Sequence, residues 1–172
     1  MSKSEFILLI PGIIYGVAMV DLLKIFRHKN TYWEIIAWGI AMFLNLIVSW
    51  FGLYDRLETI SSNIVFFSVY LLSPLLFAQA VFVLTPEEND TETKEYFLSN
   101  QRTFFILYLG FVITNLLLSF FITENTALQY MRAIAIAPFI LVIIWPKKWL
   151  RVLLLIMYYI FALIIYAESL SV

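Results

Sequence analysis

Residues Thr85–Arg102, TPEENDTETKEYFLSNQR, form the one long polar run in a chain of 172 residues, and they hold five of its twelve acidic side chains. Almost unbroken apolar sequence lies on either side of this run. Long apolar stretches joined by short polar connections are typical of a chain that crosses a lipid bilayer several times. The polar run therefore divides a predicted membrane protein into two apolar halves.

The composition supports lipid as the solvent. Hydrophobic residues make up 63% of the chain and charged residues 13%, against roughly 45–50% and roughly 25% in soluble domains. The net charge is -1, which gives no basic field for nucleic acid. There is no cysteine and a single histidine, His28. No metal-ligand set or nucleophile–base pair can be named, so we expect no cofactor and no metal, and an intramembrane enzyme is the least favoured of three possible functions.

The apolar runs predict an all-α integral membrane protein, a single transmembrane domain over residues 1–172. A helix needs about 20 apolar residues to cross a bilayer, and six stretches qualify. They cover residues 5–26, 33–53, 60–84, 103–122, 127–145 and 149–168. The shortest division is the turn at Pro146-Lys147-Lys148, where proline and two lysines would be costly in hydrocarbon.

The distribution of lysine and arginine predicts the orientation. Eight basic residues lie near the first, third and fifth connections, and three lie near the opposite ends of the helices. Because basic residues favour the cytoplasmic side, we expect residues 85–102 in the cytoplasm and both termini outside it. In a bacterium this would be the inner membrane. The eight residues are Lys24, Arg27, Lys29, Lys94, Arg102, Lys147, Lys148 and Arg151.

Two features are predicted within the polar run. Thr85-Pro86-Glu87-Glu88 matches a capping box with proline at the first helical position, which predicts a short helix there. A solvated linker with one helical turn is the equal alternative. From about Thr93 onward, a helix could begin in water before it enters the bilayer. A docking surface for a cytoplasmic partner would use the acidic residues of this run, Glu87, Glu88, Asp90 and Glu92.

The second and fourth predicted helices share a pattern. Asn45 and Ser49 in one, and Asn115 and Ser119 in the other, are spaced i and i+4, which places each pair on one helical face. A chain built from three helical hairpins on one plan would show such a repeat, and so would chance in a sequence rich in Leu and Phe. The two asparagines either line a polar site or pore, or join helices by hydrogen bonds, which is the commoner role.

Other polar or small residues lie within the predicted spans. Gln79 either lines the same polar path or joins helices. Arg132 either pairs with an acid at the outer helix ends (Glu5, Glu124 or Glu168) or binds an anion, since an arginine within a span is costly without a partner. Gly12 and Gly16 form a GxxxG pattern beside Pro11, which allows close helix approach.

The chain resembles a loosely defined group of small bacterial multi-pass membrane proteins with no assigned activity. The resemblance implies a class of protein and no particular function. It rests on aromatic patterns, namely Tyr32-Trp33 with Trp38, Trp50-Phe51-Gly52, and Tyr96-Phe97 leading through Asn100 and Arg102 to Phe104-Phe105.

Two other functions are favoured over an enzyme by the sequence. One is a non-catalytic scaffold or sensor subunit that docks a partner through its acidic cytoplasmic segment. The other is a small oligomeric channel or transporter with a polar path past Asn45, Asn115 and Gln79. The expected partners are the lipid bilayer and either further copies of the chain or another membrane protein.

Overall fold

The fold is described from a computed structural model. It describes residues 3–27, 29–87, 92–122 and 126–170. Within these ranges, side chains are described except at residues 3–6, 51–59, 61–62, 121–122, 126–128, 131 and 165–170.

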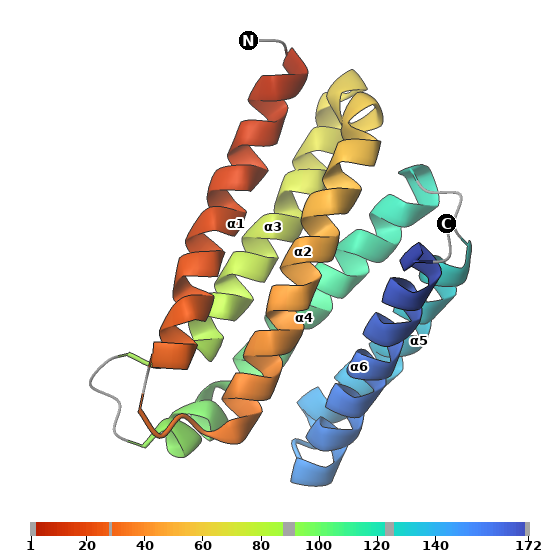
Figure 1. The fold of residues 1–172 in the computed structure, drawn as a ribbon. Helices are drawn as coiled ribbons and strands as arrows, with labels where there is room; N and C mark the ends of the chain where they lie inside the picture. Colours follow the sequence, from red (N-terminus) through yellow and green to blue (C-terminus); the bar gives the residue numbers. More distant parts are fainter. Residues whose placement is uncertain (1–2, 28, 88–91, 123–125, 171–172) are drawn as a thin grey trace.

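The described residues form an all-α bundle, as the sequence predicts (Figure 1). Pro11, Pro74 and Pro138 lie inside continuous helices, and in each case the helix continues past the proline. The helices are α1 (Lys3–Arg27), α2 (Trp33–Ser62), α3 (Ile64–Leu84), α4 (Thr93–Ile122), α5 (Thr126–Ile144) and α6 (Lys148–Leu170).

Four helices, α1 to α4, each contain a stretch long and apolar enough to cross a membrane, and α5 carries a shorter apolar stretch. Large apolar side chains also cover the outside of the bundle. On α1, Ile13, Val17 and Val20 are each more than half exposed and follow one helical face. An apolar exterior of this kind is stable in lipid and would aggregate in water, which indicates a membrane protein.

The second helix is longer than predicted. The sequence predicts a connection after residue 53, but α2 continues to Ser62 and only Asn63 separates it from α3. The side-chain oxygen of Asn63 accepts a hydrogen bond of 2.8 Å from the backbone N–H of Val65. Because residues 53–62 contain no proline and Asn63 caps the next helix, the helix ends at the cap and not at the polar residues before it.

The predicted capping box at Thr85 is wrong where the structure describes it. Thr85 ends α3, and Pro86 and Glu87 are not helical. The Thr85 hydroxyl donates to the carbonyl of Val81 at 2.9 Å, so it is used at the end of a helix. Glu88 lies outside the described residues. The predicted early start of the fourth helix is confirmed, because α4 begins at Thr93.

The six helices do not pack as three equivalent hairpins. α3 packs along α4, and α5 packs more extensively on α4 than on α6. α1, α2 and α3 form one group, α4 lies beside them, and α5 and α6 lie at the far edge (Figure 1). Within the part of the chain that the structure describes, α6 therefore meets the first group through α2 alone.

Candidate functional site: an interhelical cavity above a closed end

A buried ion pair between Glu34 and Arg151 joins the first turn of α2 to the first turn of α6. Nε of Arg151 donates to Oε2 of Glu34 at 2.7 Å, and its Nη2 donates to Oε1 at 3.0 Å. The exposed fractions of the two side chains are 4% and 1%. Charge-assisted bidentate pairs of this kind are among the strong hydrogen bonds of proteins.

Neighbouring groups complete the hydrogen bonding of this pair. Nη1 of Arg151 donates to Oε1 of Gln101 at 2.9 Å and to the carbonyl of Pro146 at 2.7 Å. The Tyr32 hydroxyl donates to Oε1 of Glu34 at 2.6 Å. Burial, together with the Glu34 carboxylate, raises the pKa of the Tyr32 hydroxyl above its usual 10.0, so this donor keeps its proton. The network joins α2, α4, α6 and the turn before α6.

Two tyrosines extend the contact one and two turns along α2. The Tyr159 hydroxyl donates to the carbonyl of Ala37 at 2.7 Å, and the Tyr158 hydroxyl donates to the carbonyl of Ala41 at 2.8 Å. With the ion pair, these bonds hold α6 against the first part of α2, from Glu34 to Ala41.

An aromatic cluster fills the bundle at the same level. Trp38 is fully buried, and its ring packs edge-on against Phe104, Phe105 and Tyr108 at centroid distances of 5.6, 5.3 and 6.0 Å. Phe139 of α5 packs on Tyr108 at 5.3 Å. Because these rings come from α2, α4 and α5, they close this end of the bundle with side chains.

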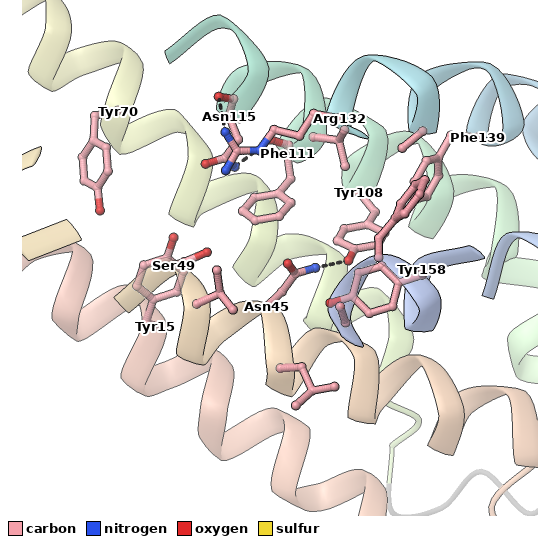
Figure 2. A pocket seen from close by; sticks show the side chains of 16 residues that line it. Tyr15, Asn45, Ser49, Tyr70, Tyr108, Phe111, Asn115, Arg132, Phe139 and Tyr158 are labelled. Carbon is pink, nitrogen blue, oxygen red and sulfur yellow. Dashed lines mark hydrogen bonds between the residues drawn. The ribbon is translucent and has the colours of Figure 1, made fainter. Parts of the chain in front are cut away.

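A cavity of about 170 Å³ begins where this packing ends, from Leu44 onward on α2 (Figure 2). It is lined by residues of all six helices. Four tyrosines, Tyr15, Tyr70, Tyr108 and Tyr158, contribute to its wall. The other polar lining residues are Asn45, Ser49, Asn115 and Arg132, and the remainder are apolar or aromatic.

The two asparagines both line the cavity and both make interhelical hydrogen bonds. The Asn45 amide donates to the hydroxyl of Tyr108 on α4 (Figure 2). The Asn115 amide donates to the hydroxyl of Ser73 on α3 at 2.7 Å and to the carbonyl of Phe111 at 2.9 Å. Asn45 and Asn115 therefore each line a partly polar cavity and also join two helices, which are the two roles that the sequence left open.

Arg132 brings a positive charge to the cavity. Its Nη1 donates to the backbone carbonyl of Asn115 at 3.3 Å, and Figure 2 shows the guanidinium beside Asn115. Its side chain is half-buried. The side chains of its predicted acidic partners, Glu5, Glu124 and Glu168, lie outside the description.

The structure brings together four of the six predicted ligand or pore residues, Asn45, Ser49, Asn115 and Arg132. Gln79 lies elsewhere, exposed on the outside of α3. Ser119 is buried, and its hydroxyl donates to the carbonyl of Leu116 in its own helix at 2.7 Å. The predicted path past Gln79 is therefore not formed within one copy of the described chain.

The two glycines of the GxxxG pattern are in different surroundings. A Cβ added at Gly12 would lie 3.1 Å from the ring of Trp50 on α2, whereas one added at Gly16 would meet nothing within 4 Å. Gly12 therefore allows close contact between α1 and α2, and Gly16 leaves room on the surface of α1.

Of the predicted docking acids, Glu87 and Glu92 are exposed, and Glu88 and Asp90 lie outside the described residues. Hydrogen bonds hold both ends of this segment. The Tyr96 hydroxyl donates to the carbonyl of Thr85 at 3.0 Å, and the Thr93 hydroxyl donates to the carbonyl of Asn30 at 3.2 Å. Across the described ranges, no group of three or more His, Asp or Glu side chains could hold a metal ion.

Sequence reasoning missed Glu34 as a site residue, and it counted Arg151 only as a charge at a helix end. Both lie inside predicted spans, 33–53 and 149–168, where a charge is costly without a partner. One acid and one base in such positions could have indicated the pair. Tyr15, Tyr70 and Tyr158 were missed because tyrosines in a chain rich in aromatic residues carry little signal.

Comparison with family models, curated proteins and solved structures finds no match to this chain. Any assignment of function therefore depends on its own residues.

Proposed function

We propose that this chain is a non-catalytic, multi-pass membrane protein that captures a small molecule in the interhelical cavity, as the ligand-binding part of a sensor or uptake system. All six helices cross the bilayer, and the protein lies in a bacterial inner membrane with both termini outside the cytoplasm. The cavity is then in the outer half of the membrane, and the ion pair of Glu34 and Arg151 is near the cytoplasmic face.

One observation carries the proposal: a partly polar cavity that ends against packed side chains. A cavity with a few placed polar groups among apolar walls is the usual form of a small-molecule site. A scaffold needs no such cavity. A channel through one chain would need a path past Trp38 and Phe105, which are fully buried in the aromatic cluster.

Filling the cavity tests the proposal. Ala135 lines the cavity, whereas Ala137 on the same helix is exposed. We expect wild-type protein in phosphatidylcholine nanodiscs to bind benzyl alcohol, measured by saturation-transfer NMR against empty nanodiscs. Ala135→Phe should lower that binding about tenfold or more, because the new ring occupies the space.

Ala137→Phe is the matched control, with the same change placed away from the cavity, and its binding should equal that of the wild type. Equal binding by both variants, or no binding by the wild type, would refute a capture site.

A second role, docking through the acidic segment, is favoured by the way the segment is held. Tyr96 and Thr93 fix its ends to the end of α3 and to the turn between α1 and α2, and the described acids Glu87 and Glu92 are exposed beside these ends. A sensor would then bind its ligand on one side and its partner on the other. Neutralising Glu87, Glu88, Asp90 and Glu92 should remove a co-purifying protein, whereas changing Ser99 to Ala should not.

A further inference from the structure

Asn45 and Ser49 form a polar strip on the part of the cavity wall that α2 provides. They lie four residues apart in one helix, so they share a helical face, and both line the cavity. Both side chains are half-buried. The two polar groups are therefore presented to the same enclosed space.

The hydrogen bonding of Asn45 leaves part of its amide unused. A carboxamide carries two N–H donors and an oxygen that can accept. The nitrogen of Asn45 donates to the Tyr108 hydroxyl, and among the described residues its side-chain oxygen accepts no hydrogen bond. Figure 2 shows the nitrogen turned to Tyr108 and the oxygen on the other side of the amide. Asn115, by contrast, donates to both Ser73 and Phe111.

The Ser49 hydroxyl is also unused. In a helix, such a hydroxyl can donate to the carbonyl four residues before it, as the hydroxyls of Thr114 and Ser68 do in this chain. Ser49 makes neither that bond nor any other hydrogen bond within the part of the chain that the structure describes. One turn of α2 thus offers a hydroxyl, an amide oxygen and an amide hydrogen to the contents of the cavity.

These groups favour a ligand that can pair with them. A polar group that is removed from water and left without a partner is costly. A site built around such groups discriminates against an analogue that lacks the matching hydroxyl or amide, because that analogue leaves them unpaired. A hydroxyl or a primary amide both donates and accepts, so it matches the strip.

The rest of the wall suits a flat apolar body. Phe111, Phe139 and Phe161 line the cavity, and aromatic rings pack favourably against other rings. The volume of about 170 Å³ can be compared with a cavity of about 150 Å³ that holds benzene. A single ring with one small substituent fits this space.

We propose that the ligand is a small ring compound that carries a hydroxyl or amide group, with this group at Asn45 and Ser49 and the ring against the aromatic side chains. The assignment rests on the proposed capture function and specifies its ligand class.

Two probes that differ by one hydroxyl test the ligand class. Binding of benzyl alcohol and of toluene is titrated by saturation-transfer NMR on wild-type protein in phosphatidylcholine nanodiscs. Empty nanodiscs give the concentration of each probe in the bilayer, and both affinities are referred to that concentration. We expect benzyl alcohol to bind about fivefold more tightly than toluene, because its hydroxyl pairs with the strip.

Variants of the strip locate this preference. Ser49→Ala and Asn45→Leu should each lower the preference for benzyl alcohol by about twofold or more, and toluene binding should stay as in the wild type. Ser68→Ala is the matched control, since it removes a hydroxyl from an exposed position on α3, and it should change neither affinity. Because Asn45→Leu also removes the bond to Tyr108, Ser49→Ala decides if that variant loses toluene binding. Ser49→Thr keeps the hydroxyl and should keep the preference.

The failure of this assignment is distinct from the failure of the capture function. If the two probes bind equally and Ala135→Phe weakens both, capture stands and the ligand class is wrong. A preference that persists in Ser49→Ala, or that falls equally in Ser68→Ala, would overturn the role of the strip. Persistence would mean that water satisfies these groups in place of the ligand.

Discussion

At the scale of single residues, the pair of Glu34 and Arg151 has the largest expected effect on stability. Both side chains are almost fully buried, and removing one partner leaves the other charge without compensation. Such losses cost about 3–5 kcal/mol. By contrast, Lys24 and Asp21 form a pair of 2.6 Å whose lysine is 55% exposed, and pairs of this kind contribute about 0–1 kcal/mol.

Arg151→Met should therefore destabilise the protein by about 3–5 kcal/mol, and Lys24→Met by less than about 1 kcal/mol. Unfolding in mixed detergent micelles, followed by tryptophan fluorescence, measures both. The double variant Glu34→Met with Arg151→Met should recover much of the loss, because two apolar side chains can replace a buried pair. Similar losses of stability for Arg151→Met and Lys24→Met would show that the buried pair contributes no more to stability than the exposed one.

At the scale of helices, α6 is the element whose position is least secured. Its described residues pack on α5 and, among α1 to α3, on α2 alone. The hydroxyls of Tyr158 and Tyr159 supply two of its bonds to α2. Interhelical hydrogen bonds in membranes contribute about 0.6 kcal/mol on average, so their loss should loosen α6 without unfolding the bundle.

The double change Tyr158→Phe and Tyr159→Phe should accelerate amide hydrogen exchange in α6 and leave α1 and α3 unchanged. Hydrogen exchange with mass spectrometry measures this helix by helix. Tyr130→Phe, at a tyrosine that is 70% exposed, is the control and should have no effect. Faster exchange spread evenly over all helices would mean that the two hydroxyls support the whole bundle and not α6 alone.

At the scale of the whole molecule, the number of crossings decides which groups share a side of the membrane. Six crossings would place the junction at Asn63 outside and the segment at Glu92 in the cytoplasm. Both residues are exposed, and the chain has no cysteine of its own. Single cysteines introduced at these two positions therefore report the arrangement without background.

Asn63→Cys should react with a membrane-impermeant maleimide in intact cells, and Glu92→Cys should react only in inside-out vesicles. The labelled fraction is read from a mass shift on a gel. Reaction of both cysteines from the same side would rule out a membrane crossing by α3, the helix that lies between them.

Much of the helical framework follows from the sequence because a span is a local property. An uninterrupted apolar run of sufficient length forms a helix wherever it meets lipid, since its backbone must satisfy its own hydrogen bonds. The predicted bounds of the first, fifth and sixth spans agree with α1, α5 and α6 to within two residues. The predicted connection after residue 53 was wrong, because α2 continues until Asn63 caps the next helix. The predicted helix start at Thr85 was wrong, because Thr85 bonds back to Val81 and ends α3.

The sequence by itself determined that this chain suits lipid and where α1, α5 and α6 begin and end. It also singled out Asn45, Asn115 and Arg132 as polar residues that are costly within an apolar span. Only the tertiary structure decided that these three line one cavity, that Gln79 does not, and that Arg151 reaches Glu34 across 117 positions of sequence. The physical reason is that spacing along a helix determines which residues share a face. Which faces meet depends on the packing of all six helices together.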